Sequence, residues 1–269
     1  MARNRAAMET QRVTRIFEHG PGLKSLYVPR TFDILPGQFV NLWLPGVDEK
    51  PFSVSDAAGG ELELSIKAVG RFTEAVMKLR VGDWVGIRGP CGRGFEPMAD
   101  GVLVGGGIGI APLRFLARRL RERGLRHRLL FGVRNRQDLI FAADYARGVE
   151  LWSDDGSLGA HGLVTEGLAR MLETAPPAVI YGGGPEPMLL KVRQLARAHR
   201  IPIQLTFERY MKCGFGICGH CCMDGSGLRL CVEGPVLTEA QLAGVTELGQ
   251  PHRLASGARP PVTLTTIEP

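Results

Sequence analysis

The chain has 269 residues, of which 44% are hydrophobic and 22% charged, and its formal net charge is +6. This composition is typical of a globular protein, and the length suffices for about two domains and a small appendage. No apolar run approaches the roughly 20 residues that cross a bilayer, so we expect no membrane association. The first ten residues are basic but lack the apolar centre of a secretory signal, so we expect a cytoplasmic protein that starts at Met1 or Met8.

Residues 11–94 predict a small antiparallel β-barrel. Short alternating runs such as residues 38–44 and 61–67 are separated by proline and glycine, which is the spacing of small all-β domains. One helix-like stretch, residues 72–79, interrupts these runs. We place this first domain at residues 1–98.

Two segments of this domain carry groups suited to phosphate. Residues 50–55, KPFSVS, set a cation beside hydroxyls where a strand begins, and residues 70–73, GRFT, begin the helix-like stretch. The first segment offers charge and the second a helix N-terminus. Taken singly, each segment is more often a solvated loop or a helix cap.

From Gly101 the pattern changes to that of a parallel α/β domain, which we place at residues 99–202. Strand-like and helix-like runs alternate along it, at 102–104, 111–123, 129–133, 178–181 and 186–199. This order of strand, helix and strand predicts a parallel sheet wound with helices.

A glycine-rich loop connects the first strand of this domain to its first helix. Residues 105–112, GGGIGIAP, bring backbone N–H groups and a helix N-terminus to a position that suits a pyrophosphate. The loop does not match the Rossmann fingerprint, because Ile110 or Pro112 stands where the third glycine belongs. On glycines alone, a tight structural turn explains the loop equally well.

Arginines at nine positions between 114 and 136 supply much of the positive charge: 114, 118, 119, 121, 123, 126, 128, 134 and 136. A helix followed by a strand accounts for most of them, and no aromatic platform is interleaved with them. We therefore expect no binding to nucleic acid.

The third part, residues 203–269, comprises a strand-like run at 203–207, a cysteine-rich segment that ends near Pro235, and a tail with little pattern. Cys213, Cys218, Cys221 and Cys231 are separated by four, two and nine residues, which is the spacing of plant-type [2Fe–2S] ligands. Glycines at 214, 216 and 219 let the backbone wrap closely around such a cluster.

A zinc site is the alternative to the cluster. Zinc uses the same thiolates but more often pairs two Cys-x-x-Cys knuckles, and this segment has one. The spacing therefore favours the cluster. We interpret Cys91 and Cys222 as small buried residues and His220 as a neighbour of the cluster rather than a ligand.

Together these segments resemble the ferredoxin-reductase superfamily over residues 11–237. Within it, residues 208–222 and 233–236 look most like the electron-transfer subunits of two-component, NAD-dependent dihydroorotate dehydrogenases, as do residues 154–159 and 162–165. The resemblance implies a flavin-binding barrel, an α/β domain for NAD(P) and a small cluster-binding subdomain.

The resemblance also implies the residues that bind each cofactor. The FAD residues are Lys50, Pro51, Phe52, Ser53, Lys67, Gly70 and Thr73, with the Ser53 hydroxyl near the flavin N5 edge and Gly70 and Thr73 at the diphosphate. The NAD(H) residues are Gly105, Gly106, Gly107, Gly109, Pro112, Gly183, Gly184 and Pro185. The family usually has arginine where Lys50 stands, and lysine lacks the planar fork of arginine, so we expect weaker FAD binding here.

The implied function is to pass electrons between a partner dihydroorotate dehydrogenase catalytic subunit and NAD⁺, through the [2Fe–2S] cluster and FAD, in pyrimidine (UMP) biosynthesis. The implied assembly is a heterotetramer of two chains of each kind. Because the cofactors carry the chemistry, we assign no catalytic side chain.

Three questions stay open at this point. Residues 218–221 also fit the electron-transfer subunits of a sulfhydrogenase or an anaerobic sulfite reductase. A non-catalytic zinc or nucleotide-sensing module is the alternative of another class. The sequence does not decide between NADH and NADPH.

Overall fold

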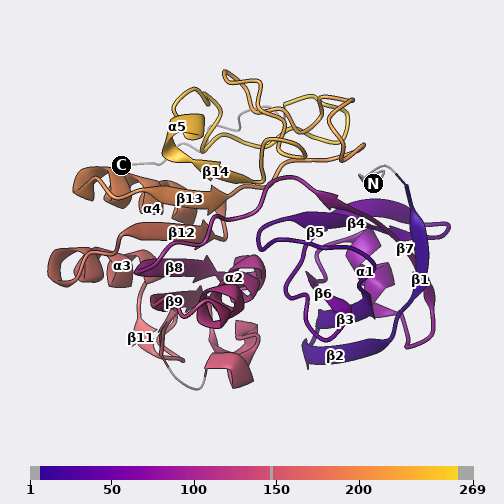
Figure 1. The fold of residues 1–269 in the computed structure, drawn as a ribbon, viewed down its shortest axis with the longest axis horizontal. Helices are drawn as coiled ribbons and strands as arrows, with labels where there is room; N and C mark the ends of the chain where they lie inside the picture. The colour runs from indigo at the N-terminus through magenta and orange to yellow at the C-terminus, as the bar shows by residue number, and fades with distance from the viewer. Residues whose placement is uncertain (1–6, 146–147, 260–269) are drawn as a thin grey trace, which may run out of the picture.

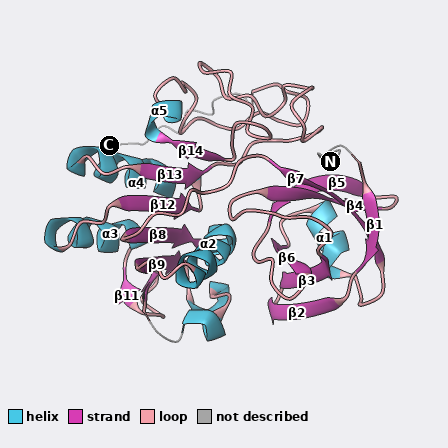
Figure 2. Cartoon of the chain, viewed as in Figure 1, coloured by secondary structure: helices cyan, strands magenta, loops and turns pink. Residues whose placement is uncertain are grey.

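Two antiparallel sheets form the N-terminal part of the molecule (Figures 1 and 2). The protein is represented by a computed structural model that describes residues 7–145 and 148–259, so Met1 lies outside the described residues. One sheet has the strand order β1-β7-β4-β5 and the other β2-β3-β6. The elements are β1 Glu9–Arg12, β2 Arg15–Gly20, β3 Leu23–Pro29, β4 Phe39–Leu44, β5 Asp48–Ser53, β6 Glu61–Lys67, α1 Arg71–Met77 and β7 Trp84–Cys91.

Side-chain alternation explains how these two sheets share a core. On β6, Leu62, Leu64 and Ile66 point into the core, whereas Glu63 points out of it toward α2. Residues of β4 and β7 complete the same core. The expected antiparallel architecture is confirmed, although the strand pairing gives two sheets and closes no barrel among the described residues.

The second part of the molecule is built on a seven-stranded sheet with the strand order β11-β10-β9-β8-β12-β13-β14. All its strands pair in parallel except β14, which is antiparallel to β13. The strands are β8 Gly101–Gly106, β9 His127–Val133, β10 Val149–Ser153, β11 Ala160–His161, β12 Val179–Gly183, β13 Ile203–Thr206 and β14 Val236–Thr238. The helices are α2 Ile110–Glu122, α3 Val164–Thr174, α4 Glu186–His199 and α5 Glu239–Leu242, with short 3₁₀ turns η1 Gly107–Gly109, η2 Arg136–Asp138 and η3 Ala142–Tyr145.

Helices cover both faces of this sheet. On β8, Val102 and Val104 share a core with α3 and α4, whereas Leu103 between them packs with α2. Strands buried on both faces read as nearly continuous apolar runs, which is how this strand appears in the sequence. The parallel α/β prediction is confirmed.

Ion pairs join the two parts of the molecule. Arg114 Nη1 on α2 lies 2.6 Å from Glu63 Oε2 on β6, and Arg118 Nη2 lies 2.6 Å from Asp56 Oδ1. Lys67 Nζ lies 2.7 Å from Asp138 Oδ1. Two of the arginines that gave the sequence its basic stretch thus hold α2 against the antiparallel sheets.

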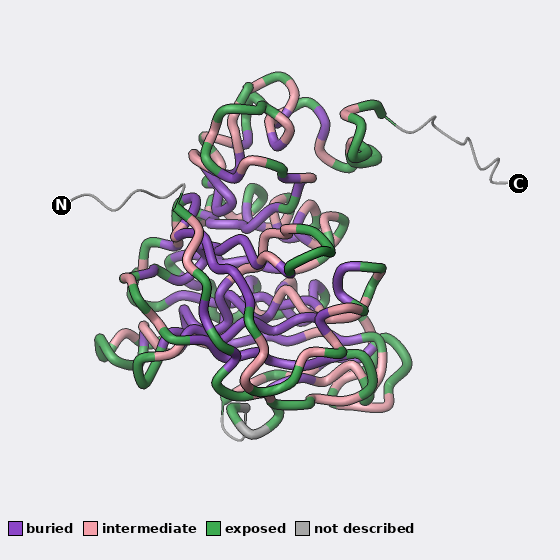
Figure 3. The backbone as a smooth tube through the Cα atoms, turned by 90° about the vertical axis from the view of Figure 1, so that its right-hand side faces the viewer, coloured by how far each residue is buried: buried purple, intermediate pink, exposed green. Residues whose placement is uncertain are grey.

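The chain after β13 is irregular in backbone but well packed. Residues 207–235 contain no helix or strand, yet Met223 and Leu230 are fully buried in the core that they share with α3 and α4. Figure 3 shows these buried stretches among exposed turns. None of the helices within residues 7–145 and 148–259 is long and apolar enough to cross a membrane.

The tail is anchored by charged groups. Arg209, which is buried, bonds Glu247 at 2.6 Å and Glu186 at 2.7 Å. His252 Nε2 lies 3.0 Å from Glu186, and Arg253 pairs with Asp224 at 2.9 Å. Residues 243–259 therefore pack on the body of the protein, and residues 260–269 lie outside the described part of the chain.

Candidate functional site

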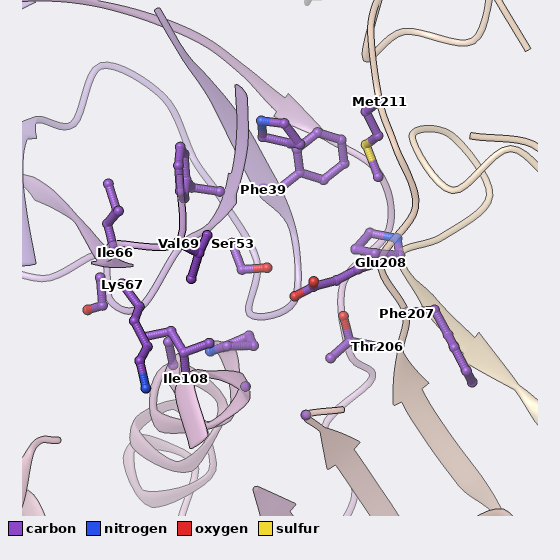
Figure 4. Close-up of a pocket in the computed structure, with 18 of the residues that line it drawn as sticks. Phe39, Ser53, Ile66, Lys67, Val69, Ile108, Thr206, Phe207, Glu208 and Met211 are labelled. Atoms are coloured by element: carbon purple, nitrogen blue, oxygen red, sulfur yellow. The ribbon is translucent and has the colours of Figure 1, made fainter. Parts of the chain in front are cut away.

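Two connected cavities lie where the antiparallel sheet of β4 and β5 meets α2 and residues 206–211, which we call the linking segment. Their volumes are about 340 and 590 Å³. Figure 4 shows the first, with Phe39, Ser53 and Lys67 on one side and Glu208 and Met211 on the other. Along these two cavities the structure brings together all seven predicted FAD residues: Lys50, Pro51, Phe52, Ser53, Lys67, Gly70 and Thr73.

Local bonds at α1 fix the far end of these cavities. The Thr73 hydroxyl accepts from the backbone N–H groups of Val69 and Gly70, at 2.8 and 3.1 Å, and donates to the Gly70 carbonyl at 2.9 Å. No atom lies within 4 Å of the position that a Cβ on Gly70 would take, so the cavity is open there. Thr73 thus shapes the turn that leads into α1.

Lys50 keeps its charge at the cavity wall. Burial lowers the pKa of its ammonium group, but the hydrogen bond to Asp48 and contact with Tyr210 outweigh that effect and raise the pKa above its ordinary value. Its Nζ atom lies 5.4 Å from the centre of the Tyr210 ring. A cation therefore stands between the cavity and the linking segment, where an anionic group of a ligand is favoured.

A third cavity, of about 980 Å³, lies at the carboxyl ends of β8, β9, β10 and β12. Ligands of open α/β sheets bind at this edge. Of the predicted NAD(H) residues, Gly106, Gly107, Gly109, Gly184 and Pro185 line it, and Pro112 lines the smaller cavity beside it. Gly109 and Gly184 line both, so the two spaces adjoin.

Gly105 and Gly183 line none of the three cavities. A Cβ on Gly105 would collide with Ile110, and one on Gly183 would collide with the Gly109 carbonyl. These glycines let the two loops pack against each other and against α2. Their predicted role in holding NAD(H) is therefore indirect in this structure.

Several cavity residues were missed by the sequence analysis. Thr206 and His252 line cavities although neither belongs to a recognised motif, and Glu208 lines them although it was singled out only as part of the resemblance at residues 208–222. Thr165 and Glu166, at the start of α3, line the large cavity. The position of Thr206 at the end of a strand was the one available signal, since strand ends meet at the ligand-binding edge of a parallel sheet.

Glu208 is the one described residue that lines all three cavities. Figure 4 shows its carboxylate directed toward Ser53 across the smallest cavity. Burial among the surrounding residues raises the pKa of this carboxyl, and the nearby His252 opposes that rise in part. The open cavities still leave the side chain accessible, so Glu208 is a carboxyl that ligands can reach from three sides.

The four cysteines lie in one irregular loop, residues 213–231, which we call the cysteine loop. Cys221 and Cys231 are buried, Cys213 is half-buried and Cys218 is exposed. Gly214, Gly216 and Gly219 have φ angles of 73°, 90° and 69°, in the left-handed region that favours glycine. These turns direct backbone N–H groups toward the sulfur atoms.

The backbone stabilises thiolates in this loop. Burial alone raises the pKa of Cys213, but N–H groups of Cys218, Phe215 and Ile217 outweigh it and lower the pKa to about 6. A hydrogen bond from the Cys231 thiol lowers the pKa of Cys221 to about 7 and raises that of Cys231. Thiolate is the form that binds iron, so this donor set fits a cluster.

The remaining cysteines and His220 behave differently. Cys91 is buried as expected, whereas Cys222 is only half-buried. His220 packs edge-on against Tyr210 and contacts the Ala255 carbonyl at 3.0 Å. Within the described residues, no group of three or more His, Cys, Asp and Glu is arranged to hold a single metal ion.

Comparisons with known proteins agree with this division of sites. Residues 25–95 match the family described as oxidoreductase FAD-binding domain, and residues 208–243 match the iron-sulfur cluster binding domain of dihydroorotate dehydrogenase B. The chain is 41% identical to a probable dihydroorotate dehydrogenase B (NAD(+)) electron transfer subunit from Methanocaldococcus jannaschii, with 92% of this chain and 96% of the relative covered. The same-named protein of Methanothermobacter thermautotrophicus is 43% identical, with 94% and 97% covered.

Solved structures extend the likeness to the fold. The structure of an NADH-dependent reduced ferredoxin-NADP oxidoreductase superposes with a TM-score of 0.79 and 26% identity, and the match covers 88% of this chain and 91% of that one. The ferredoxin reductase of carbazole 1,9a-dioxygenase superposes with a TM-score of 0.64 and 27% identity, over 74% and 68%.

Proposed function

The chain belongs to the family of dihydroorotate dehydrogenase B electron transfer subunits, and we propose that it carries electrons from a partner catalytic subunit to NAD⁺ through a [2Fe–2S] cluster and FAD. The partner would oxidise dihydroorotate to orotate, and this chain would not bind dihydroorotate itself. The pathway is pyrimidine biosynthesis.

One observation carries this proposal, namely that the linking segment forms a wall of all three cavities and continues into the cysteine loop. Thr206 to Met211 line the flavin cavities, Glu208 reaches the dinucleotide cavity, and Cys213 follows two residues after Met211. Sites for a dinucleotide, a flavin and a cluster are thus adjacent, which electron transfer among them requires.

The cofactors supply the redox chemistry when bound, a hydride exchange between nicotinamide and flavin and single electrons at the cluster. The residues of this chain hold and orient them. The two glycine loops bring Gly109 and Gly184 beside both the flavin and the dinucleotide cavities. Lys50 offers a positive charge to the flavin diphosphate, and Cys213, Cys218, Cys221 and Cys231 hold the cluster.

The large cavity favours NAD(H) over NADP(H). Asp154, at the carboxyl end of β10, lines it. An acidic group at such a strand end accepts a hydrogen bond from the ribose 2′-hydroxyl and repels a 2′-phosphate. Arg134 lines the same cavity, where it pairs with Asp138, and Arg136 donates to the Ser157 carbonyl.

The exposed tip of the cysteine loop is the proposed contact with the catalytic subunit. Ile217 is 80% exposed and Phe215 is 39% exposed, and Cys218 beside them is exposed as well. Apolar side chains so exposed next to a redox centre fit a protein partner. We propose an assembly of two catalytic and two electron-transfer chains in the cytoplasm.

The experiment that tests the function is dihydroorotate-dependent reduction of NAD⁺ by this chain mixed with the catalytic subunit from the same source. Each chain is assayed alone as the control. We expect NADH only in the mixture. If the purified chain carries flavin and cluster yet yields no NADH in the mixture, the electron-transfer role stands, and the search for the partner moves to the sulfur-reducing relatives.

A further inference from the structure

The cysteine loop rests on the same antiparallel sheet that walls the flavin cavities. Arg88 on β7 donates from Nη1 to the carbonyl of Cys213 at 2.6 Å. Beside it, a Cβ on Gly214 would stand 2.6 Å from Nδ2 of Asn41 on β4, so the loop backbone lies directly on that side chain. The backbone of one proposed cluster ligand is therefore bonded to this sheet.

Arg88 brings a buried positive charge to this contact. The residue is 5% exposed, and its Nε donates to Glu49 Oε1 on β5 at 2.9 Å. Nη2 bonds the same carboxylate, so the carboxylate sits on the Nε–Nη2 edge of the guanidinium while Nη1 points to Cys213. Of the two charges, the positive one is nearer to the cysteine.

Strand register connects this contact to the flavin wall. Asn41 is paired with Arg88 on β7 at one side and with Pro51 on β5 at the other. Pro51 lines both flavin cavities. Three neighbouring positions across the sheet thus lead from the flavin cavity to the carbonyl of Cys213.

We propose that Arg88, held by Glu49, is a positioning residue that seats the cluster against the flavin wall and raises the reduction potential of the cluster. The inference rests on the proposed function, because it presumes a cluster on the four cysteines. The reduced cluster carries one more electron than the oxidised one, and a nearby positive charge stabilises that form. One electron is gained or lost at the cluster, and no bond forms or breaks.

The test measures the midpoint potential and the electron paramagnetic resonance spectrum of the cluster in the full chain. We expect R88M to lower the potential and E49Q to raise it, each changing the electron equilibrium with a reference dye about three- to tenfold. R88K keeps the charge, so its potential stays nearer that of the wild type. R193M is the matched control, because Arg193 makes a similar two-bonded pair with Glu239 on α5.

Shifts of the midpoint potential in opposite directions in R88M and E49Q support the proposal. A residue that only supported the loop structurally would not shift the potential in opposite directions in the two variants. No shift in either variant, shifts of the same sign, or an equal shift in R193M would overturn it. If R88M retains no cluster, the test rests on E49Q. A raised midpoint potential in E49Q supports the role of Arg88, and an unchanged potential refutes it. A wild-type chain without a cluster signal would refute the proposed function as well.

Discussion

The four cysteines of the cysteine loop differ in how deeply the fold buries them. Cys221 and Cys231 are buried, whereas Cys218 is exposed. The spacing of the four cysteines was readable in the sequence because all four fall within 19 residues. Arg88 and Asn41, which hold that loop, come from strands more than a hundred residues earlier and were not predictable from spacing.

Substitution of Cys218 by Ser is expected to abolish the visible absorption of the cluster while FAD content and NADH-to-dye activity stay near wild type. The reason is that Cys218 lines none of the cavities that hold the predicted flavin and dinucleotide residues. Absorption spectroscopy and a dye-reduction assay measure the two properties. C222S is the control and should keep both; loss of flavin together with the cluster in C218S would contradict the separate sites.

Glu208 is predicted to make the stability of the protein fall as pH rises. Because its pKa is raised in the folded state, the folded protein binds more protons than the unfolded one above the ordinary value of 4.5. Stability is therefore lost as pH rises from that value through the raised pKa. E208Q removes this loss, so its thermal midpoint should exceed that of wild type by an amount that grows with pH.

Calorimetry at several pH values between about 5 and 8 tests this prediction. E74Q is the control, since Glu74 on α1 is exposed and lines no cavity. A difference between E208Q and wild type that stays constant across the range would show that Glu208 does not titrate as argued.

At the scale of elements, helix α2 joins the α/β part of the molecule to the antiparallel sheets. The sequence assigned its arginines only to a helix followed by a strand, yet Arg114 and Arg118 reach Glu63 and Asp56 on the antiparallel side. Sequence reasoning cannot pair charges that lie about 50 residues or more apart, because the pairing depends on how two domains pack.

Substitution of Arg114 by Met is expected to lower the free energy of unfolding by about 3 kcal/mol, because it leaves the buried Glu63 carboxylate without its cation. Urea unfolding of the full chain measures the change. R119M is the control, since Arg119 pairs with Glu122 on the exposed face of the same helix, and should change stability by less than about 1 kcal/mol. Equal losses of stability in the two variants would contradict a special stabilising role for the ion pair between Arg114 and Glu63.

Prediction of the elements succeeded where the signal was local. The helix at 186–199 agrees with α4 residue for residue, because Pro185 and Pro187 mark its start and His199 precedes a turn. No element was predicted between 134 and 177, where β10 and α3 lie. β14 was missed as well, because its three residues become a strand only through pairing with β13.

At the scale of the whole molecule, the cysteine loop forms an exposed apolar tip. We expect I217D to weaken binding to the catalytic subunit about tenfold or more, since a charge would replace a central apolar contact. Titration calorimetry measures the affinity. V81D is the matched control, because Val81 is 61% exposed and apolar but lies in the turn between α1 and β7. Equal loss of affinity in both variants would refute the contact at Ile217.

Because Glu208 faces three cavities at once, we expect the ligands of those cavities to change one another's affinity. Whatever the factor by which a bound dinucleotide changes the affinity for the flavin, the flavin changes the affinity for the dinucleotide by the same factor. We therefore expect a substitution in residues 206–211 to alter this coupling even when the substituted residue contacts one ligand alone.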